Sequence, residues 1–139
     1  MSAYRIVALP GDGTGREVMT EALKVLDVFQ KNGDAEFEIK VIPCGGQHYL
    51  ETGEQWPEGS FEICRDESDA ILLGAIGWPD ARLPNGDVAG GEVILGLRSG
   101  LDLYANVRPV KLYQGVHHKV HGIYKEVWKS SLVDLVMVR

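Results

Sequence analysis

The first part of the chain changes twice between strand-like and helix-like spacing of its apolar residues. A β-branched run at 4–9 stops at a Pro-Gly pair, which predicts a strand that ends in a turn. Residues 37–42 alternate apolar and charged side chains, as a second strand would. Between them a helix is predicted, because apolar residues recur at helical spacing and an Asn-Gly pair at 32–33 supplies a stop. Its apolar positions are Val18, Ala22, Val25, Leu26 and Phe29.

Two further elements continue the same alternation. Residues 57–66 are a candidate short helix, since proline is tolerated in the first turn of a helix. Residues 70–76 are continuously apolar, which is typical of a strand buried on both faces of a parallel sheet. The order strand, helix, strand, helix, strand indicates an α/β fold. Residues 78–91 follow as a loop rich in proline, glycine and aspartate, too long for a mere connection and therefore expected to be functional or mobile.

The last part of the chain has weaker patterns. Residues 91–99 can form a short helix, and a strand is expected over 101–110. The apolar run 133–138 predicts a final buried strand. Residues 114–129 favour a solvated loop or arm, and the role of the three histidines in it stays open because they fit no known metal-ligand pattern. These histidines are His117, His118 and His121.

Length and charge narrow the class of protein. A chain of 139 residues has the size of one ordinary domain. Its formal net charge of −6 argues against a nucleic-acid partner, which would require a basic surface. No apolar run approaches the roughly 20 residues that span a membrane, and no signal-like segment precedes the first strand. We therefore expect a soluble cytoplasmic protein in which a local basic cluster would have to hold any anionic substrate.

The two cysteines carry little chemical information. Cys44 and Cys64 are too few for a disulfide framework. They also lack the spacing of metal-binding cysteines. We expect both to be buried structural thiols.

Two arginines flank a short extended segment and suggest a carboxylate-binding site. The planar guanidinium binds carboxylates bidentately and keeps its charge at working pH. In a strand, the two-residue period places Arg108 on the same face as Asn106. In a helix, Ile94 lies on the same face as Arg98, which would set an aliphatic wall beside the arginine. The alternative is that Arg98 and Arg108 only form ion pairs on the protein surface.

Two glycine-rich segments follow predicted strands. Residues 11–15 lie where the first strand turns into a helix, a position that can hold an anion, although a tight structural turn is favoured. A dinucleotide fingerprint would require glycine where the chain has Arg16. Residues 74–77 lie at the carboxyl end of the apolar strand, where open α/β sheets bind ligands. A glycine-rich strand exit without a ligand is the alternative there.

Four segments, in order along the chain, resemble the isocitrate and isopropylmalate dehydrogenases, which are metal-dependent enzymes that oxidise and decarboxylate 2-hydroxy acids. They are residues 9–18, 72–77, 97–109 and 133–139. The resemblance implies the open-sheet α/β fold of that family, incomplete here and limited to the N-terminal part of a two-domain fold. It further implies that residues 1–99 form the first half of the large cofactor-side domain, and that 100–139 begin the second, substrate and dimerisation domain.

The resemblance also implies how the substrate is bound. Three arginines match those that bind the malate portion shared by the family's substrates: Arg98, Arg108 and Arg139. Residues one turn before the first arginine choose the substrate's side group, and Ile94 and Leu95 offer apolar area there. We therefore expect 3-isopropylmalate. Isocitrate, homoisocitrate, malate and tartrate stay open, because an aliphatic helix face also serves ordinary packing.

For the cofactor the resemblance implies NAD. The segment expected to contact its nicotinamide side includes Gly74, Ala75, Ile76, Gly77 and Glu92. NADP in place of NAD stays open, because the determinants of coenzyme choice lie mainly in a part of the family's chain that is missing here. Thr14 and Arg16 depart from the family, which usually has isoleucine and proline at these positions.

The expected reaction is hydride transfer to NAD followed by loss of CO2, with Mg2+ or Mn2+ stabilising the enolate. In the resembled family the catalytic Tyr and Lys and three metal-binding Asp come after the position of Arg139. We therefore expect no catalytic or metal-ligating residue in this chain, and no activity from it alone. The apolar strands 70–76 and 133–138 would then be exposed. A homodimer is expected for the complete enzyme; an inactive diacid-binding or assembly module and a non-functional fragment are competing hypotheses.

Overall fold

The computed structural model describes residues 3–139, which form two compact units, one ending at Asp102 and one spanning Leu103–Arg139. The first unit contains β1 (Tyr4–Leu9), α1 (Thr14–Lys31), β2 (Phe37–Val41), α2 (Gly46–Thr52), α3 (Ser60–Asp66), β3 (Ala70–Leu73) and α4 (Gly91–Gly100). The second unit contains β4 (Val107–Lys111), β5 (His118–Val120), β6 (Ile123–Lys125), a short 3-10 helix (Ser130–Leu132) and β7 (Asp134–Val138).

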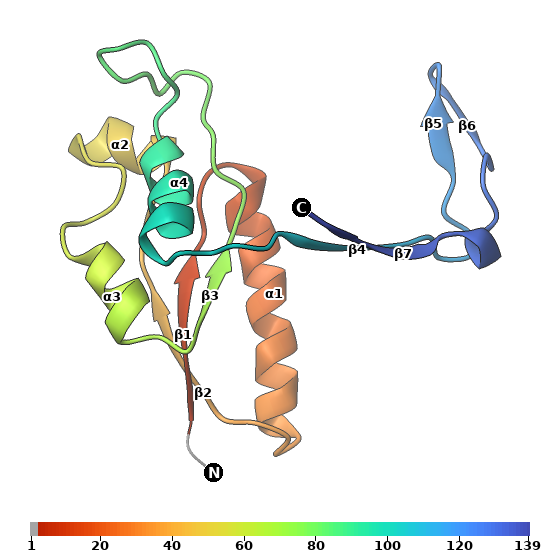
Figure 1. Ribbon diagram of the computed structural model, residues 1–139, viewed down its shortest axis with the longest axis horizontal. Helices are drawn as coiled ribbons and strands as arrows, with labels where there is room; N and C mark the ends of the chain where they lie inside the picture. The colour runs from red at the N-terminus through yellow and green to blue at the C-terminus, as the bar shows by residue number, and fades with distance from the viewer. Residues whose placement is uncertain (1–2) are drawn as a thin grey trace. The chain divides into compact units, whose positions relative to one another are not determined.

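A three-stranded parallel sheet organises the first unit. Its strand order is β2-β1-β3, and Ile6 of β1 lies between Ile39 of β2 and Ala70 of β3. Figure 1 shows α1 on one side of this sheet and α3 and α4 on the other. The predicted α/β class is confirmed. Because the strands are parallel, the glycine-rich turns that follow them lie at one edge of the sheet.

The core of the first unit lies on both faces of β1. Val7 and Leu9 are 2% and 0% exposed and belong to one apolar cluster with Cys64 of α3 and with Val93 and Leu97 of α4. The two-residue period of a strand turns the intervening side chains, which are also buried, to the opposite face. β1 is therefore the strand on which both helical layers depend.

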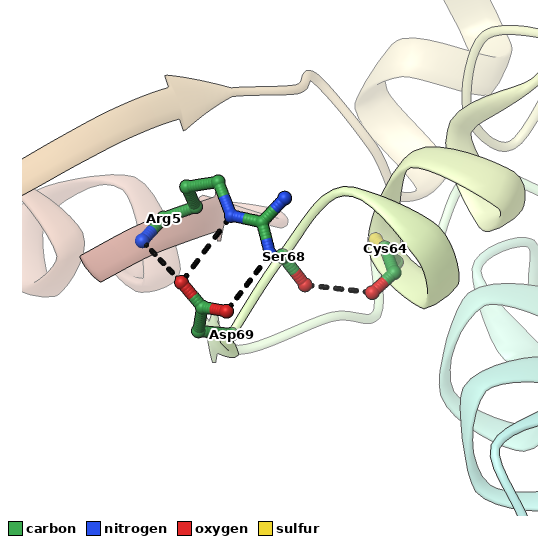
Figure 2. A network of polar contacts seen from close by, with 4 residues as sticks. All are labelled: Arg5, Cys64, Ser68 and Asp69. Atoms are coloured by element: carbon green, nitrogen blue, oxygen red, sulfur yellow. Dashed lines mark hydrogen bonds and ion pairs between the residues drawn. The ribbon is translucent and has the colours of Figure 1, made fainter. Parts of the chain in front are cut away.

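An ion pair fastens the start of β3 to β1 at the other end of the sheet (Figure 2). The Arg5 guanidinium donates to both carboxylate oxygens of Asp69, with an Nη2 to Oδ1 distance of 2.9 Å. The backbone N–H of Arg5 also donates to Asp69 Oδ2, at 2.8 Å. These bonds to Arg5 hold the pKa of the Asp69 carboxyl below its ordinary value. Nearby, the Ser68 hydroxyl donates to the Cys64 carbonyl and closes the end of α3.

Three elements of the first unit differ from the sequence prediction. The short helix α2 is not predicted, since seven residues that begin with glycine show no apolar period. The helix predicted over 57–66 begins only at Ser60, after Gly59, whose φ of 80° is non-helical. The strand predicted over 70–76 ends at Leu73. Its predicted burial on both faces is wrong, because Ala70 and Leu73 at its ends are exposed, Leu73 to 40%, and the two residues between them are only half-buried.

The second unit consists of two antiparallel ribbons. β4 pairs with β7, and β5 pairs with β6. A two-stranded ribbon cannot bury both of its faces, and every residue of β7 is exposed. The prediction of a buried strand at 133–138 is therefore wrong. The exposure of apolar residues expected for 70–76 and 133–138 is confirmed at Leu73 and along β7.

One further prediction for this unit needs correction. The strand expected over 101–110 begins only at Val107. Residues 114–129, expected to be a solvated loop or arm, are largely exposed and contain the β5–β6 hairpin, whose pairing the sequence does not predict. In that hairpin His118 packs edge-on against Trp128, with ring centroids 5.3 Å apart. Among residues 3–139, no helix combines the length and the apolar character that crossing a membrane would require.

Gly74→Ala tests how closely the end of β3 approaches the turn after β1. A Cβ at this position would overlap the carbonyl oxygen of Pro10, so we expect the free energy of unfolding to fall by about 1–3 kcal/mol. Gly96→Ala in α4 is the matched control: nothing lies within 4 Å of its added methyl group. Alanine there should raise stability by about 0.5–1 kcal/mol. Urea denaturation measures the free energy of unfolding of both variants. Equal effects of the two substitutions would contradict the close approach of Gly74 to the Pro10 carbonyl.

Both cysteines are buried free thiols, as expected. Burial raises the pKa of the Cys44 thiol to about 11 and raises that of Cys64 in the same direction. The folded thiols therefore stay protonated at a pH where unfolded thiols ionise.

We expect neither thiol to react with Ellman's reagent at pH 8 until the chain unfolds. Because folding raises the thiol pKa, the stability that the two thiols contribute should be constant below the ordinary thiol pKa and should fall as the pH rises from there. Urea denaturation at pH 7 and pH 10 checks the sign, and Cys44→Ala should show a shallower fall. Rapid reaction of both thiols in the folded chain would contradict their burial.

Candidate functional site

The carboxyl edge of the sheet is organised around one buried carboxylate. Asp12, in the turn after β1, is 3% exposed. Its Oδ2 accepts hydrogen bonds from the backbone N–H groups of Gly46 at 2.8 Å and Gly77 at 2.9 Å, and its Oδ1 accepts one from Gln47 at 2.8 Å. Gly46 and Gln47 open α2, where a negative charge complements the helix dipole. Asp12 thus joins the turn after β1, the start of α2 and the loop after β3.

Backbone contacts bring the same segments together. The N–H of Asp12 donates to the Ala75 carbonyl at 2.7 Å, and the N–H of Gly74 donates to the Leu9 carbonyl at 2.8 Å. Gly11 has a φ of 71°, and a Cβ on it would overlap the Ala75 carbonyl oxygen. The glycine-rich segment 11–15 is therefore a tight packing turn, the favoured interpretation of its sequence.

The loop predicted to contact the cofactor is packed at one end and open at the other. Its first residue, Gly74, lies against the turn after β1. Ile76 is half-buried, and its side chain occupies the space that a Cβ on Gly90 would need. By contrast, nothing lies within 4 Å of a Cβ built on Gly77. The loop is thus held firmly against the start of α4 while Gly77 leaves room for a ligand beside the backbone.

Glu92 is held at the start of α4 by a single glutamine. Gln55 Nε2 donates to Glu92 Oε2 at 2.7 Å, and Gln55 Oε1 accepts the N–H groups of Gly90 and Glu92. The glutamine therefore fixes both the backbone and the side chain of this turn. Because Gly90 also touches Ile76, the structure brings Glu92 and the 74–77 loop into one region of the first unit.

The first predicted arginine lies on the exposed side of α4. Val93 and Leu97 are 0% and 5% exposed and orient the helix. Arg98 is in the last turn, where a cation complements the helix dipole, and its side chain is exposed. Ile94, four residues earlier, is half-buried, and Leu95 is 62% exposed. An apolar surface therefore accompanies Arg98 on this helix.

The other two predicted arginines, Arg108 and Arg139, lie on the same face of the β4–β7 ribbon. Asn106 and Arg139 exchange two backbone hydrogen bonds, at 2.9 and 3.1 Å, so their side chains project to the same face. Arg108, two residues after Asn106, shares that face, and its Nε donates to Asn106 Oδ1 at 3.2 Å. Asn106 thus contacts the Arg108 guanidinium and pairs across the ribbon with the backbone of Arg139. Arg98 belongs to the first unit.

Two residues of this region, Asp12 and Gln55, are not predicted from the sequence to have a role. Both act on backbone groups far along the chain, and Asp12 reaches Gly77 over 65 positions. The signal for Asp12 is its place between two glycines directly after a buried strand, where a charged side chain needs a partner. Within residues 3–139, no three His, Cys, Asp or Glu side chains are grouped so that they could hold a metal ion.

An open parallel sheet whose turns gather at its carboxyl edge places the first unit among the ligand-binding α/β folds. Residues 5–139 match the family model described as isocitrate/isopropylmalate dehydrogenase. The chain therefore belongs to the isocitrate/isopropylmalate dehydrogenase family.

Individual relatives agree with this family. The chain is 40% identical to a 3-isopropylmalate dehydrogenase of Clostridium acetobutylicum, over 100% of this chain and 38% of the relative. It is 44% identical to a 3-isopropylmalate dehydrogenase of Thermotoga maritima, over 97% of this chain and 38% of the relative. The chain therefore spans less than two-fifths of the length of these relatives.

Solved structures show the same fold. A β-decarboxylating dehydrogenase from Thermococcus kodakarensis is similar over 98% of this chain and 41% of its own, with a TM-score of 0.61 and 27% identity. An isocitrate dehydrogenase from Methylococcus capsulatus is similar over 97% of this chain and 34% of its own, with a TM-score of 0.71 and 23% identity. The second likeness supports the fold alone.

Asp12→Asn tests the role of the buried carboxylate. The amide keeps the size of the side chain but removes the charge and turns an N–H2 group towards backbone donors. Because a hydrogen bond to a charged group contributes about 1.5–3 kcal/mol and such bonds are not additive, we expect the free energy of unfolding to fall by about 2–4 kcal/mol.

Asp80→Asn is the matched control, since Asp80 is exposed and joins no hydrogen bond of the described residues. It should change the free energy of unfolding by less than about 0.5 kcal/mol. Urea denaturation measures both variants. A loss as small for Asp12→Asn as for Asp80→Asn would contradict the central place of Asp12.

Proposed function

We propose that this chain carries the diacid-binding arginines and part of the cofactor cleft of an NAD-dependent and metal-dependent dehydrogenase. The complete enzyme oxidises and decarboxylates a 2-hydroxy diacid, with 3-isopropylmalate favoured. The observation that carries the proposal is the shared face of Arg108, Asn106 and Arg139 in a member of this family. Arg98 of the first unit completes the set of arginines in the proposal.

The chemistry of the β4–β7 ribbon supports an anionic substrate. Two guanidinium groups on one face can each pair bidentately with a carboxylate. The ion pair of this ribbon, Lys111 with Asp134 at 3.2 Å, lies at its opposite end and does not neutralise the arginines. The Asn106 amide oxygen orients Arg108 without cancelling its charge. A substrate with two carboxylates is therefore the ligand that this face suits.

The surface of α4 supports an apolar side group on that substrate. Ile94 and Leu95 precede Arg98 by about one turn, and Leu95 is largely exposed. Covering a branched aliphatic group is worth about 1.5–3 kcal/mol. A polar side group, as in isocitrate, would instead need hydroxyl or amide hydrogen-bond partners at these positions. The aliphatic pair is the reason for preferring 3-isopropylmalate over isocitrate, homoisocitrate, malate or tartrate.

The cofactor part of the proposal rests on the loop after β3. Gly74, Ala75, Ile76 and Gly77 with Glu92 would face the nicotinamide side of NAD, which supplies the hydride acceptor when bound. The open space at Gly77 and the fixed carboxylate of Glu92 support this role. The described residues offer no metal-ion cluster, so we place the Mg2+ or Mn2+ ligands and the catalytic acid and base in a region downstream of this chain.

The proposal also assigns a domain to each part of the chain. Residues 1–99 would form the first half of the large cofactor-side domain, and residues 100–139 would begin the substrate and dimerisation domain. The exposed apolar residues of β7 support pairing with a second copy in a homodimer. We place the enzyme in the cytoplasm, with a small-molecule diacid as its ligand and with neither nucleic-acid nor membrane partners.

The test is NADH absorbance with NAD, Mg2+ or Mn2+ and a panel of isopropylmalate, isocitrate, malate and tartrate. The 139-residue chain should give none. A chimera that continues this chain with the downstream region of the Thermotoga maritima relative should turn over one diacid. In the chimera, Arg108→Ala should lower kcat/KM by about 100-fold or more, or about 2.7 kcal/mol. Arg65→Ala, on α3, is the control and should have no effect.

Three results would revise the proposal. Turnover by the 139-residue chain itself would show that its own residues do the chemistry. Diacid binding without turnover in the chimera would favour the inactive binding module. Equal activity of the Arg108→Ala and Arg65→Ala chimeras would remove the ribbon arginines from the substrate site.

A further inference from the structure

A cavity of about 450 Å3 opens where β1 and β2 end, between α1 and α2. β2 and β3 lie on opposite sides of β1, so this cavity is on the other flank of the sheet from the 74–77 loop. The carboxyl ends of parallel strands are the usual place for ligands in open α/β sheets. The volume falls within the range of small-molecule sites, roughly 300–1,000 Å3. No part of the proposed dehydrogenase reaction uses this cavity.

Arg16 gives the cavity a positive charge that no ion pair within residues 3–139 neutralises. It lies in the first turn of α1, where the helix dipole disfavours a cation. Its Nε donates to the Gly11 carbonyl at 3.3 Å. It forms no ion pair with any carboxylate of residues 3–139, whereas Lys24 and Lys31 on the same helix are paired. An anion at Arg16 would therefore supply a partner that the protein does not.

His48 is the second polar group, and it points to a ligand independently. It lines the cavity and is only 9% exposed. The hydrogen bond at this residue uses its backbone carbonyl, which accepts from Thr52 Oγ1 at 2.9 Å. No hydrogen bond joins the imidazole nitrogens to another described side chain or backbone group. Neither nitrogen is among the fully buried side-chain atoms that lack a partner, so the imidazole can exchange hydrogen bonds with a ligand in the cavity.

The remaining wall limits what can bind. Met19, Leu23 and Val41 supply apolar surface. Cys44 also lines the cavity, and because burial raises the pKa of its thiol to about 11, it is a neutral wall and not a nucleophile. Glu51 of α2 adds one negative charge to the lining. That charge disfavours a ligand with two or more anionic groups, such as a diacid.

We propose that this cavity binds a small organic monocarboxylate. Its carboxylate would lie between the Arg16 guanidinium and the His48 imidazole, and its hydrocarbon part would lie against Met19 and Leu23. The lining of the cavity includes none of the diacid-binding arginines. Failure of this proposal would therefore leave the proposed dehydrogenase function untouched.

The test uses benzoate as the probe and two-dimensional 1H–15N spectra of the 139-residue chain. We expect saturable shifts of the Gly11 and His48 amide signals. Arg16→Gln should weaken the apparent affinity about tenfold or more, which corresponds to about 1.4 kcal/mol. Lys24→Gln removes one positive charge from the same helix away from the cavity, and it should bind as the parent chain does. Benzyl alcohol, which has the ring without the charge, should bind at least about tenfold more weakly than benzoate.

Several results would overturn the proposal. The absence of saturable shifts at Gly11 and His48 would show that the cavity takes no monocarboxylate. Equal weakening by Arg16→Gln and Lys24→Gln would reduce the effect to net charge. Tighter binding of benzylamine than of benzoate would make Glu51 the anchor and the ligand a cation. His48→Gln keeps a hydrogen-bonding group in the cavity and should retain more affinity than His48→Ala; the reverse order would also contradict the proposal.

Discussion

The carboxylate of Asp12 is the interaction on which the carboxyl edge of the sheet depends. It satisfies three backbone N–H groups that lie on two separate segments, at the start of α2 and after β3. Without it, the first turn of α2 would bury unpaired donors, because no other side chain caps that helix. The turn after β1 also approaches the Ala75 carbonyl too closely for any residue but glycine at position 11. One charge and one missing Cβ therefore fix the turns at the carboxyl edge of the first unit's sheet, where the 74–77 loop lies.

The proposed ligand-binding arginines differ in environment from the residues that stabilise the fold. Asp12 and Gln55 have all their partners inside the first unit and hold backbone. Arg98, Arg108 and Arg139 are exposed and form no ion pair with a described carboxylate. Charged groups that a fold leaves without partners are available to a ligand, whereas charged groups with several buried partners stabilise the fold. Asp12 and Gln55 therefore stabilise the fold around the candidate site, whereas the three arginines are available to bind a ligand.

The sequence predicts the long elements well because their patterns are local. The apolar periods of β1, α1 and β2 repeat several times, and the two-residue period correctly places Arg108 beside Asn106. Burial is predicted less well: the apolar runs at 70–76 and 133–138 indicate strands, but exposure depends on whether another layer covers them, as Leu73 and Val136 show. The bonds from Asp12 to Gly46 and Gly77 join positions 34 and 65 apart. No local pattern contains them, and the same holds for the cavity that brings Arg16 to His48.

Amide hydrogen exchange tests the central claim most directly. In the parent chain the N–H groups of Gly46, Gln47 and Gly77 should be protected, since all three donate to one buried carboxylate. In Asp12→Asn we expect the three amides to lose protection together, while the amides of β1 that pair with its neighbouring strands stay protected. Unchanged protection at all three, or loss at only one of them, would show that Asp12 does not hold these segments together.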